Sequence, residues 1–276
     1  MDYTELSIDI IPQHIDSDVL TAMLADAGFE SFSEENGIYK AYIQQKLFNQ
    51  VAVEQILLSI GCTVFSFSAI ADQNWNAVWE SNFEPVVIAG RCYVRAPFHD
   101  PAPQYPYELL IEPQMSFGTA HHETTSQMIS LLLDEPLDNK SVLDMGCGTG
   151  ILAVLAVKLG AISAWAIDND EWAYNNSIEN VQRNNTPAVS VFLGDAEMLN
   201  AAPEFDVLLA NINRNILLRD LHVYRKVLKD NSIVFMSGFY ETDLDSIVEE
   251  AGKYDIQLTN HIVLNKWVAA RFHVKA

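Results

Sequence analysis

The first part of the chain alternates hydrophobic and polar positions in short runs that two helical patterns separate. TELSIDII alternates as a strand does, and a broad apolar helical face follows Ser17 and Asp18, which can cap a helix. SFSEENGIYKAYI predicts a hairpin with its turn at Asn36 and Gly37. A second helix ending at Gly61 and a final strand, TVFSFSAIA, complete the pattern. This order predicts a small α+β ferredoxin-like domain over residues 1–71, which we expect to recognise or dock a partner.

A helical pattern and several short extended runs connect this domain to the rest of the chain. DQNWNAVWESNFEP places Trp75 and Trp79 four residues apart, on one face of a linker helix expected over residues 72–84. Tryptophans at this spacing are more typical of packing than of chemistry. The runs PVVIAG, RCYVRAPF and YELLIEP follow, and turns that contain glycine or proline separate them.

From His121 onward, strand patterns alternate with amphipathic helical ones. Strands are expected at SVLDMG, AWAID, SVFLGD, DVLLAN and SIVFMSG. This alternation predicts a doubly wound, largely parallel α/β sheet that is covered on both faces. Two extended runs divided at residues 264–266 should close the sheet with an antiparallel hairpin. Residues 85–276 are therefore expected to form the second domain.

Charge and cysteine content narrow the classes of function. The chain carries 37 acidic against 16 basic residues, a net charge of −21. Such a surface disfavours direct binding to nucleic acid and attracts basic partners, although acidity also serves solubility. We find no signal-peptide pattern and no apolar run of membrane-spanning length, and the three isolated cysteines suit a reducing compartment. A cytoplasmic protein without membrane contact is expected, and no sequence feature predicts more than a monomer.

A glycine-rich loop follows the first strand of the second domain. SVLDMGCGTG has the spacing GxGxG, whereas the dinucleotide fingerprint is GxGxxG, and Ile151 stands in the place of its third glycine. Asp144 lies two residues before Gly146, where a carboxylate would repel a pyrophosphate and suits a ligand with an ammonium group. Gly148 shapes the loop.

Two more acidic residues end the next strands. Asp168 closes AWAID and can accept hydrogen bonds from two vicinal ribose hydroxyls, while Asp195 and Ala196 follow the third strand, where a base edge would lie. An ammonium group, a ribose and a base without a phosphate describe S-adenosylmethionine. The first alternative is that the glycines only form a tight turn of a doubly wound fold and bind no ligand. The second is that the loop binds NAD or FAD.

Several segments resemble known families. VLDMGCGTGILAVLAVKLGA resembles the cofactor loop of class I methyltransferases, which have a Rossmann-like fold. MSFGTAHHETT, residues 115–125, is similar to the FGTGTHPTT segment of the ribosomal protein L11 methyltransferase (PrmA) family. The segment around Trp75 and Trp79 and the VLLANI motif, residues 207–212, fit the same family, so the resemblance covers essentially the full length. The chain departs from the family where GTAHHETT loses a glycine and a proline, and where Asn213 and Arg214 follow Asn211 and Ile212.

The resemblance implies a protein N-methyltransferase that uses S-adenosylmethionine. Its substrate would be a basic large-subunit ribosomal protein, L11, methylated on its α-amino group and lysine side chains, with the N-terminal domain holding that protein. Thr125, Gly146, Asp168 and Asn211 would then contact the cofactor, and Asn211 would also touch the target amine as the catalytic residue. Asp144 would order the methionine end of the cofactor, and Asp195 and Ala196 would border its adenine.

Other interpretations of these residues stay open. Asn211 could instead cap the next helix, and Thr125 could be an ordinary first-turn helix residue. His121, His122 and Glu123 do not have the spacing of a zinc motif, and no metal is expected. A methyltransferase acting on RNA, a small molecule or a release-factor glutamine is one rival, although the last typically carries Asn-Pro-Pro-Tyr. A cofactor-binding module without catalysis, used in ribosome assembly, is the other.

Overall fold

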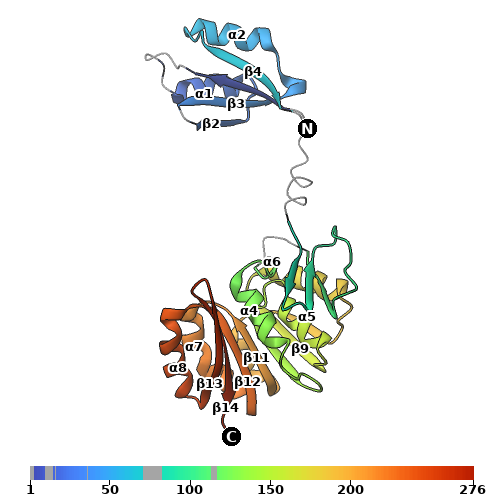
Figure 1. The fold of residues 1–276 in the computed structure, drawn as a ribbon. Helices are drawn as coiled ribbons and strands as arrows, with labels where there is room; N and C mark the ends of the chain where they lie inside the picture. The colour runs from blue at the N-terminus through green and yellow to red at the C-terminus, as the bar shows by residue number, and fades with distance from the viewer. Residues whose placement is uncertain (1–2, 10–14, 16, 36, 71–82, 113–116) are drawn as a thin grey trace. The chain divides into compact units, whose positions relative to one another are not determined.

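The computed structural model describes residues 3–9, 15, 17–35, 37–70, 83–112 and 117–276. The chain divides into two compact units, Met1–Phe83 and Glu84–Ala276 (Figure 1). Most of the expected linker helix, including Trp75 and Trp79, lies outside the described residues, and so do Asn36, Met115 and Ser116. No helix in the described part of the chain is long and apolar enough to cross a membrane.

The first unit has the ferredoxin-like arrangement that its sequence pattern predicts. Its elements are β1 (Tyr3–Ile8), α1 (Ser17–Asp26), β2 (Ser31–Glu35), β3 (Ile38–Gln44), η1 (Gln45–Leu47), α2 (Gln50–Ser59) and β4 (Phe65–Ile70). The strands pair antiparallel in the order β2-β3-β1-β4. Buried positions alternate along β1 and β3, because successive side chains of a strand point to opposite faces. The buried side chains form one core with those of α1 and α2.

The second unit begins with a small three-stranded sheet. Its strands are β5 (Val86–Ile88), β6 (Cys92–Arg95) and β7 (Tyr107–Leu110), which fall in the three short extended runs of the sequence. β5 and β6 pair antiparallel, and β6 and β7 pair parallel.

The main sheet of the second unit has seven strands in the order β10-β9-β8-β11-β12-β14-β13. They are β8 (Ser141–Met145), β9 (Ser163–Asp168), β10 (Val189–Leu193), β11 (Phe205–Asn211), β12 (Leu228–Tyr240), β13 (Ile256–Leu264) and β14 (Trp267–Val274). The first five in sequence run parallel, and β14 pairs antiparallel with both β12 and β13. The expected terminal hairpin is therefore present, and the predicted class I methyltransferase Rossmann-like sheet is confirmed.

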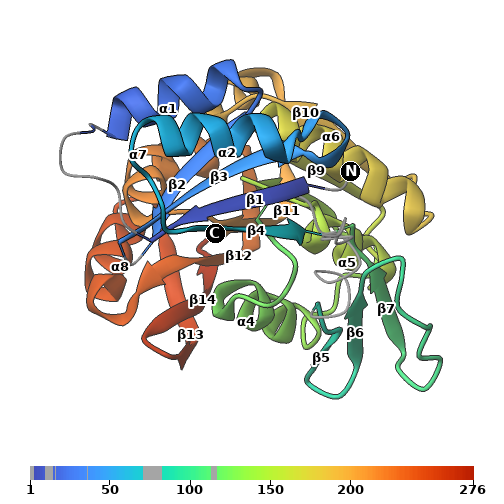
Figure 2. The same ribbon diagram turned by 90° about the horizontal axis from the view of Figure 1, so that it is seen from above.

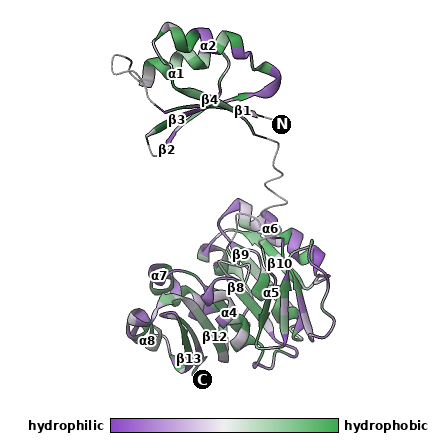
Figure 3. Cartoon of the chain, turned by 45° about the horizontal axis from the view of Figure 1, so that its top comes forward, coloured by the Kyte–Doolittle hydropathy of each residue, from purple (hydrophilic) through white to green (hydrophobic). Residues whose placement is uncertain are grey.

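Helices cover both faces of this sheet (Figure 2). One apolar core joins a sheet face to α4 (Glu123–Leu132), α5 (Ile151–Lys158) and α6 (Glu171–Arg183). A second core joins the other face to α7 (Arg214–Tyr224) and α8 (Leu244–Gly252). Short 3-10 turns are η2 (Ala196–Ala201), η3 (Arg225–Val227) and η4 (Glu241–Asp243). Hydrophobic residues gather on the central strands and on α5, while the outer sides of α6, α7 and α8 are more polar (Figure 3).

This topology fixes where a ligand can bind. After β8 the chain adds β9 and β10 on one side, and then returns to place β11 on the other side of β8. In open α/β sheets, ligands bind at the carboxyl ends of the strands beside such a switch point. The glycine loop follows β8 at that edge, and Asn211 ends β11 there.

Candidate functional site

The glycine loop connects β8 to α5 in a backbone conformation that disfavours other residues. Gly146, Gly148 and Gly150 all have positive φ, at 65°, 56° and 74°. A Cβ atom on Gly146 would overlap the Ile212 side chain, and one on Gly148 would overlap the Phe117 carbonyl. The loop therefore packs closely against the segments that follow β11 and precede α4, and neither approach leaves room for a side chain.

Asp144 lies beneath this loop and is only 1% exposed. Its Oδ2 accepts a hydrogen bond from Ala153 N at 3.1 Å, which ties the end of β8 to the first turn of α5. Burial raises the pKa of Asp144 to about 7; the hydrogen bond from Ala153 opposes this shift and the charge of Asp168 adds to it. Asp144 does not line any of the cavities described below.

Asp168 ends β9 and binds the glycine loop. Its Oδ2 accepts a hydrogen bond from Gly148 N at 2.8 Å, and its Oδ1 accepts one from Asp170 N at 3.0 Å. Asp168, Gly146, Asp195 and Ala196 line one cavity of about 80 Å³. A neighbouring hollow of about 360 Å³ shares Asp195 and Ala196 with it, so the two extend along the carboxyl edge of the sheet.

Helix α7 supplies a wall of this cavity that the sequence does not reveal. Asp220 and Tyr224 both line the cavity. Asp220 is buried and bound by Arg219, with Nε–Oδ1 at 2.7 Å and Nη2–Oδ2 at 2.8 Å. Tyr224 is fully buried, and its hydroxyl has no hydrogen-bond partner among the described residues. Burial, and secondarily the charge of Asp220, raises the pKa of Tyr224.

A second cavity, of about 260 Å³, lies on the other side of Ile212, which lines both. Asn211 and Gly238 contribute to its wall. The Asn211 amide nitrogen donates a hydrogen bond to Thr125 Oγ1 at 3.3 Å, which fixes the orientation of the amide. The Asn211 Oδ1 atom is buried and accepts no hydrogen bond from the described part of the chain.

Aromatic rings line or flank this second cavity. Phe117, His122 and Trp267 are lining residues, and Tyr240 packs on Trp267. Neighbouring ring centroids lie 5.2 Å apart for Phe117 and His122, 4.9 Å for His122 and Trp267, and 4.1 Å for Trp267 and Tyr240. The face of an aromatic ring attracts a cation, so this cavity suits a protonated amine.

The segment before α4 keeps a compact shape despite its departures from the family pattern. Ala120, which stands where the family has glycine, adopts a positive φ of 69°. Thr149 anchors the segment by donating from Oγ1 to Gly118 O at 2.6 Å and from its backbone N to Phe117 O at 3.0 Å. Glu123, in place of proline, accepts a hydrogen bond from Asn265 Nδ2 at 2.9 Å. These contacts hold the segment against the glycine loop and the hairpin tip.

The second departure, after Asn211, starts a helix. Asn213 is the N-cap of α7, and its Oδ1 accepts a hydrogen bond from Ile216 N at 3.1 Å. Arg214 forms an ion pair with Asp243 at 3.3 Å. The capping role considered for Asn211 therefore belongs to Asn213, and the Asn211 side chain is left to the cavity.

The two adjacent histidines have different surroundings. His122 is the N-cap of α4, where its Nδ1 accepts a hydrogen bond from Thr124 N at 3.2 Å. His121 instead contacts the Glu84 carbonyl through Nε2 at 2.9 Å. Across the described ranges of the chain, no group of three or more His, Cys, Asp or Glu side chains could hold a metal ion.

The structure thus brings most of the residues singled out in the sequence to one edge of the sheet. Gly146, Asp168, Asp195 and Ala196 line the first cavity, and Asn211 lines the second. Thr125, Asp144 and Gly148 line neither cavity. Thr125 accepts a hydrogen bond from Asn211, Asp144 accepts one from Ala153 N, and Gly148 N donates one to Asp168. The sequence did not identify the cavity residues Asp220, Tyr224 and Trp267, nor Tyr240 beside them, because single polar and aromatic residues in helices and strands also occur where they only pack.

Comparison with known proteins gives a matching family and closely similar relatives. The description of the matching family is "Ribosomal protein L11 methyltransferase (PrmA)", and its profile matches residues 13–275. A ribosomal protein L11 methyltransferase from Bacteroides fragilis is 45% identical over 278 residues, covering 99% of both chains. One from Porphyromonas gingivalis is 46% identical, covering 92% of this chain and 90% of the relative.

A solved structure has the same fold. The crystal structure of ribosomal protein L11 methylase from Lactobacillus delbrueckii subsp. bulgaricus superimposes with a TM-score of 0.65 at 22% identity. The match covers 70% of this chain and 100% of that one. Given the profile match over nearly all residues and relatives that align from end to end, the chain belongs to the ribosomal protein L11 methyltransferase (PrmA) family.

Proposed function

We propose that this chain transfers methyl groups from S-adenosylmethionine to amines of ribosomal protein L11, namely its α-amino group and lysine side chains. Family membership supports the reaction and the substrate protein. The observation that carries the choice of an amine is the buried Asn211 Oδ1, which has no hydrogen-bond partner among the described residues. It lies in an aromatic cavity that shares Ile212 with the cavity beside the glycine loop.

The residues of the first cavity fit the cofactor. The Asp168 carboxylate suits the two ribose hydroxyls, and Asp195 with Ala196 suits the adenine edge. The Tyr224 hydroxyl, which has no hydrogen-bond partner in the described part of the chain, is a further polar group that a nucleoside can satisfy. Asp144, buried beneath the loop, orders the methionine end indirectly, because its hydrogen bond from Ala153 N holds the end of β8 to the first turn of α5. Bound S-adenosylmethionine supplies a methyl group on a positively charged sulfur.

The residues of the second cavity prepare the amine. A free lysine amine has a pKa of about 10.4, so it arrives charged and must lose a proton before it can attack. The aromatic rings attract the ammonium form, and the apolar side chains of the wall then favour the neutral form, whose proton passes to solvent water. The Asn211 Oδ1 accepts a hydrogen bond from the neutral amine and orients its lone pair. Positioning of this kind, without a covalent nucleophile, is sufficient for direct displacement.

The remaining parts of the proposal concern the partner and its recognition. Residues 1–71 form the domain that holds the substrate protein, residues 72–84 connect it, and residues 85–276 carry catalysis. A chain with a net charge of −21 attracts a basic ribosomal protein and repels the phosphates of RNA. The enzyme acts in the cytoplasm as a monomer, without direct contact with nucleic acid or membrane.

A transfer assay with labelled S-adenosylmethionine and ribosomes that lack the modification tests this proposal. We expect label in protein L11, and we expect Asn211→Ala to slow transfer about a hundredfold with little change in cofactor affinity. Asn184→Ala is the matched control, because Asn184 binds both backbone groups of Leu110, at 3.0 and 2.7 Å, and lies in neither cavity. Asn184→Ala should lower the free energy of unfolding and leave the rate of methyl transfer unchanged.

Each other outcome of the assay contradicts the proposal in its own way. Label in RNA would identify a nucleic-acid methyltransferase. Tight cofactor binding without any transfer would identify a binding module. Equal rates for the wild type and Asn211→Ala would assign Asn211 to structure alone.

A further inference from the structure

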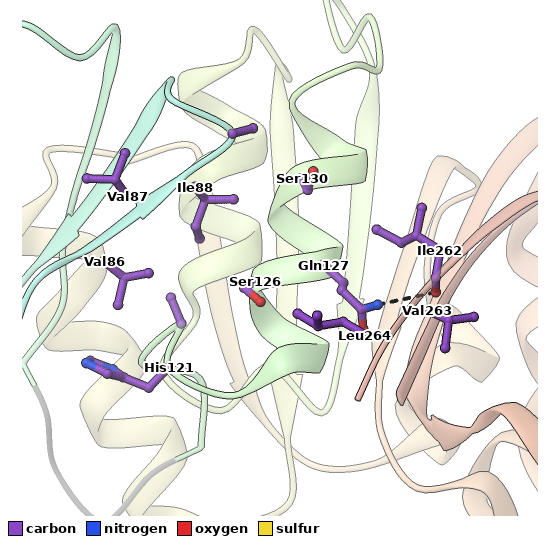
Figure 4. A pocket seen from close by; sticks show the side chains of 12 residues that line it. Val86, Val87, Ile88, His121, Ser126, Gln127, Ser130, Ile262, Val263 and Leu264 are labelled. Carbon is purple, nitrogen blue, oxygen red and sulfur yellow. Dashed lines mark hydrogen bonds between the residues drawn. The ribbon is translucent and has the colours of Figure 1, made fainter. Parts of the chain in front are cut away.

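A third hollow, of about 510 Å³, lies within the second unit on the surface of α4, between strands β5 and β13 (Figure 4). We call it the edge groove. β5 forms one wall, the end of β13 forms the opposite wall, and α4 forms the floor. Its lining residues are Val86, Val87, Ile88, Ala89, Ala120, His121, Ser126, Gln127, Ser130, Ile262, Val263 and Leu264.

Both walls of the edge groove are edge strands. Within the described ranges, β13 pairs only with β14, and β5 pairs only with β6. The outer side of such a strand presents backbone N–H and C=O groups that can pair with another chain. The wall side chains are also apolar and accessible, with Val87 45%, Val263 41% and Leu264 47% exposed. Together these features suit the addition of an extended peptide.

The floor of the edge groove contains an unsatisfied hydrogen-bond acceptor. Gln127 is 4% exposed, and its amide nitrogen donates to Ile262 O and Trp267 O, both at 3.3 Å. These two bonds fix the amide, and its Oε1 is buried without a partner among the described residues. A buried amide oxygen normally accepts a hydrogen bond, so this atom indicates that an N–H donor enters the groove.

The edge groove lies next to the aromatic cavity of Asn211, with Gln127 between them. Gln127 bridges the two strands of the terminal hairpin, since Ile262 lines the groove and Trp267 lines the cavity. Of the two adjacent histidines, His121 lines the groove and His122 lines the cavity. A chain lying in the groove is therefore close to the cavity in which we place the amine.

We infer that the edge groove binds an extended segment of the methyl-acceptor protein next to the methylated amine, by strand addition to β13; this inference rests on the proposed function. The segment carries apolar side chains, which contact the exposed apolar residues Val87, Val263 and Leu264 of the two walls. No Asp, Glu, Lys or Arg is among the lining residues that the structure describes, so the groove selects apolar rather than basic residues. A second copy of this chain is the less suitable occupant, because two chains of net charge −21 repel each other.

Two charged substitutions and a matched control test the inference in the full-length protein. Val263→Asp places a carboxylate on the β13 wall, and Val87→Asp places one on the β5 wall. Ile162→Asp is the control, because Ile162 is 60% exposed in the same unit and lies outside the groove. Both groove variants should raise the KM for ribosomal protein L11 at least about tenfold. Cofactor affinity and kcat should be unchanged in all three.

Hydrogen exchange identifies the mode of binding and the occupant. Adding ribosomal protein L11 should slow exchange of β13 amides in the wild type and not in Val263→Asp. Equal KM values for the two groove variants and the control, together with unchanged exchange in β13, would overturn the inference. Protection of β13 that grows with the concentration of this chain alone would also overturn it, in favour of a second copy.

The same data separate this inference from the proposed function. If the wild type transfers no methyl group to ribosomal protein L11, but L11 still protects the β13 amides from exchange, the inference that the groove binds L11 is supported and the proposed function is contradicted. If transfer occurs and the groove variants match the control, the proposed function stands and the groove inference fails.

Discussion

The clearest energetic prediction concerns the buried carboxyl group of Asp144. Burial raises its pKa to about 7 in the folded chain, whereas an unfolded aspartate has a pKa of about 3.9. Below pH ~4 both states hold the proton, so the group does not affect stability. Between about pH 4 and pH 7 the unfolded chain releases the proton and the folded chain keeps it. Stability therefore falls as the pH rises through this range, and the loss is complete above pH 7.

The magnitude follows from the difference between the two pKa values. About three pKa units at 1.36 kcal/mol each give a total loss of about 4 kcal/mol, of which about 2 kcal/mol falls between pH 5 and pH 7. Asp144→Asn removes the titrating group and keeps an oxygen to accept the hydrogen bond from Ala153. The free energy of unfolding of the wild type, minus that of the variant, should therefore fall by about 2 kcal/mol from pH 5 to pH 7.

Hydrogen exchange of the slowest amides in β8 measures this free energy for the second unit, after correction for intrinsic exchange rates. Asp134→Asn serves as the control for the loss of an acidic side chain in the same unit, since the Asp134 side chain is 73% exposed. A flat difference for Asp144→Asn would refute the reasoning, because it would show that the buried carboxyl titrates as it does in the unfolded chain.

Three further substitutions test single contacts. Asp168→Ala should weaken binding of S-adenosylhomocysteine at least about tenfold by calorimetry, since charged hydrogen bonds contribute about 1.5–3 kcal/mol each; unchanged affinity would remove Asp168 from the site. Ala120→Gly relieves a positive φ and should raise the free energy of unfolding, measured with urea, by up to about 1 kcal/mol. A decrease in this free energy by more than about 1 kcal/mol would show that packing of the alanine methyl group outweighs the backbone strain. Tyr224→Phe removes an unpartnered buried hydroxyl, so stability should hold or rise while cofactor affinity falls; unaltered affinity would exclude a contact with the cofactor.

The sequence predicted the strands and the loop because these depend on local patterns. The five parallel strands from β8 to β12 fall in hydrophobic runs of the sequence that end at Gly, Asp or Asn, and such runs are recognisable without tertiary information. The positive φ of Gly146 and Gly148 is likewise a local requirement. Asp168, Asp195 and Asn211 could be placed together because the carboxyl ends of parallel strands share one edge of the sheet.

The rest of the site depends on contacts between distant parts of the chain. Trp267 enters the aromatic cavity because β14 lies between β12 and β13 in the sheet, and hydrophobic periodicity does not reveal that order. The Gln127 bridge to Ile262 and Trp267 joins residues about half the chain apart. The conformation of Ala120 could not be predicted for another reason. The hydrogen bonds of Thr149 anchor its segment, and Ala120 adopts a positive φ that is typical of glycine and not of alanine.

The mass of purified ribosomal protein L11, measured before and after incubation with this chain and S-adenosylmethionine, tests the central claim most directly. The proposed function predicts that the protein gains whole methyl groups on its α-amine or lysines, and that Asn211→Ala largely prevents the gain. An unchanged mass under conditions where the chain binds the cofactor tightly would contradict it.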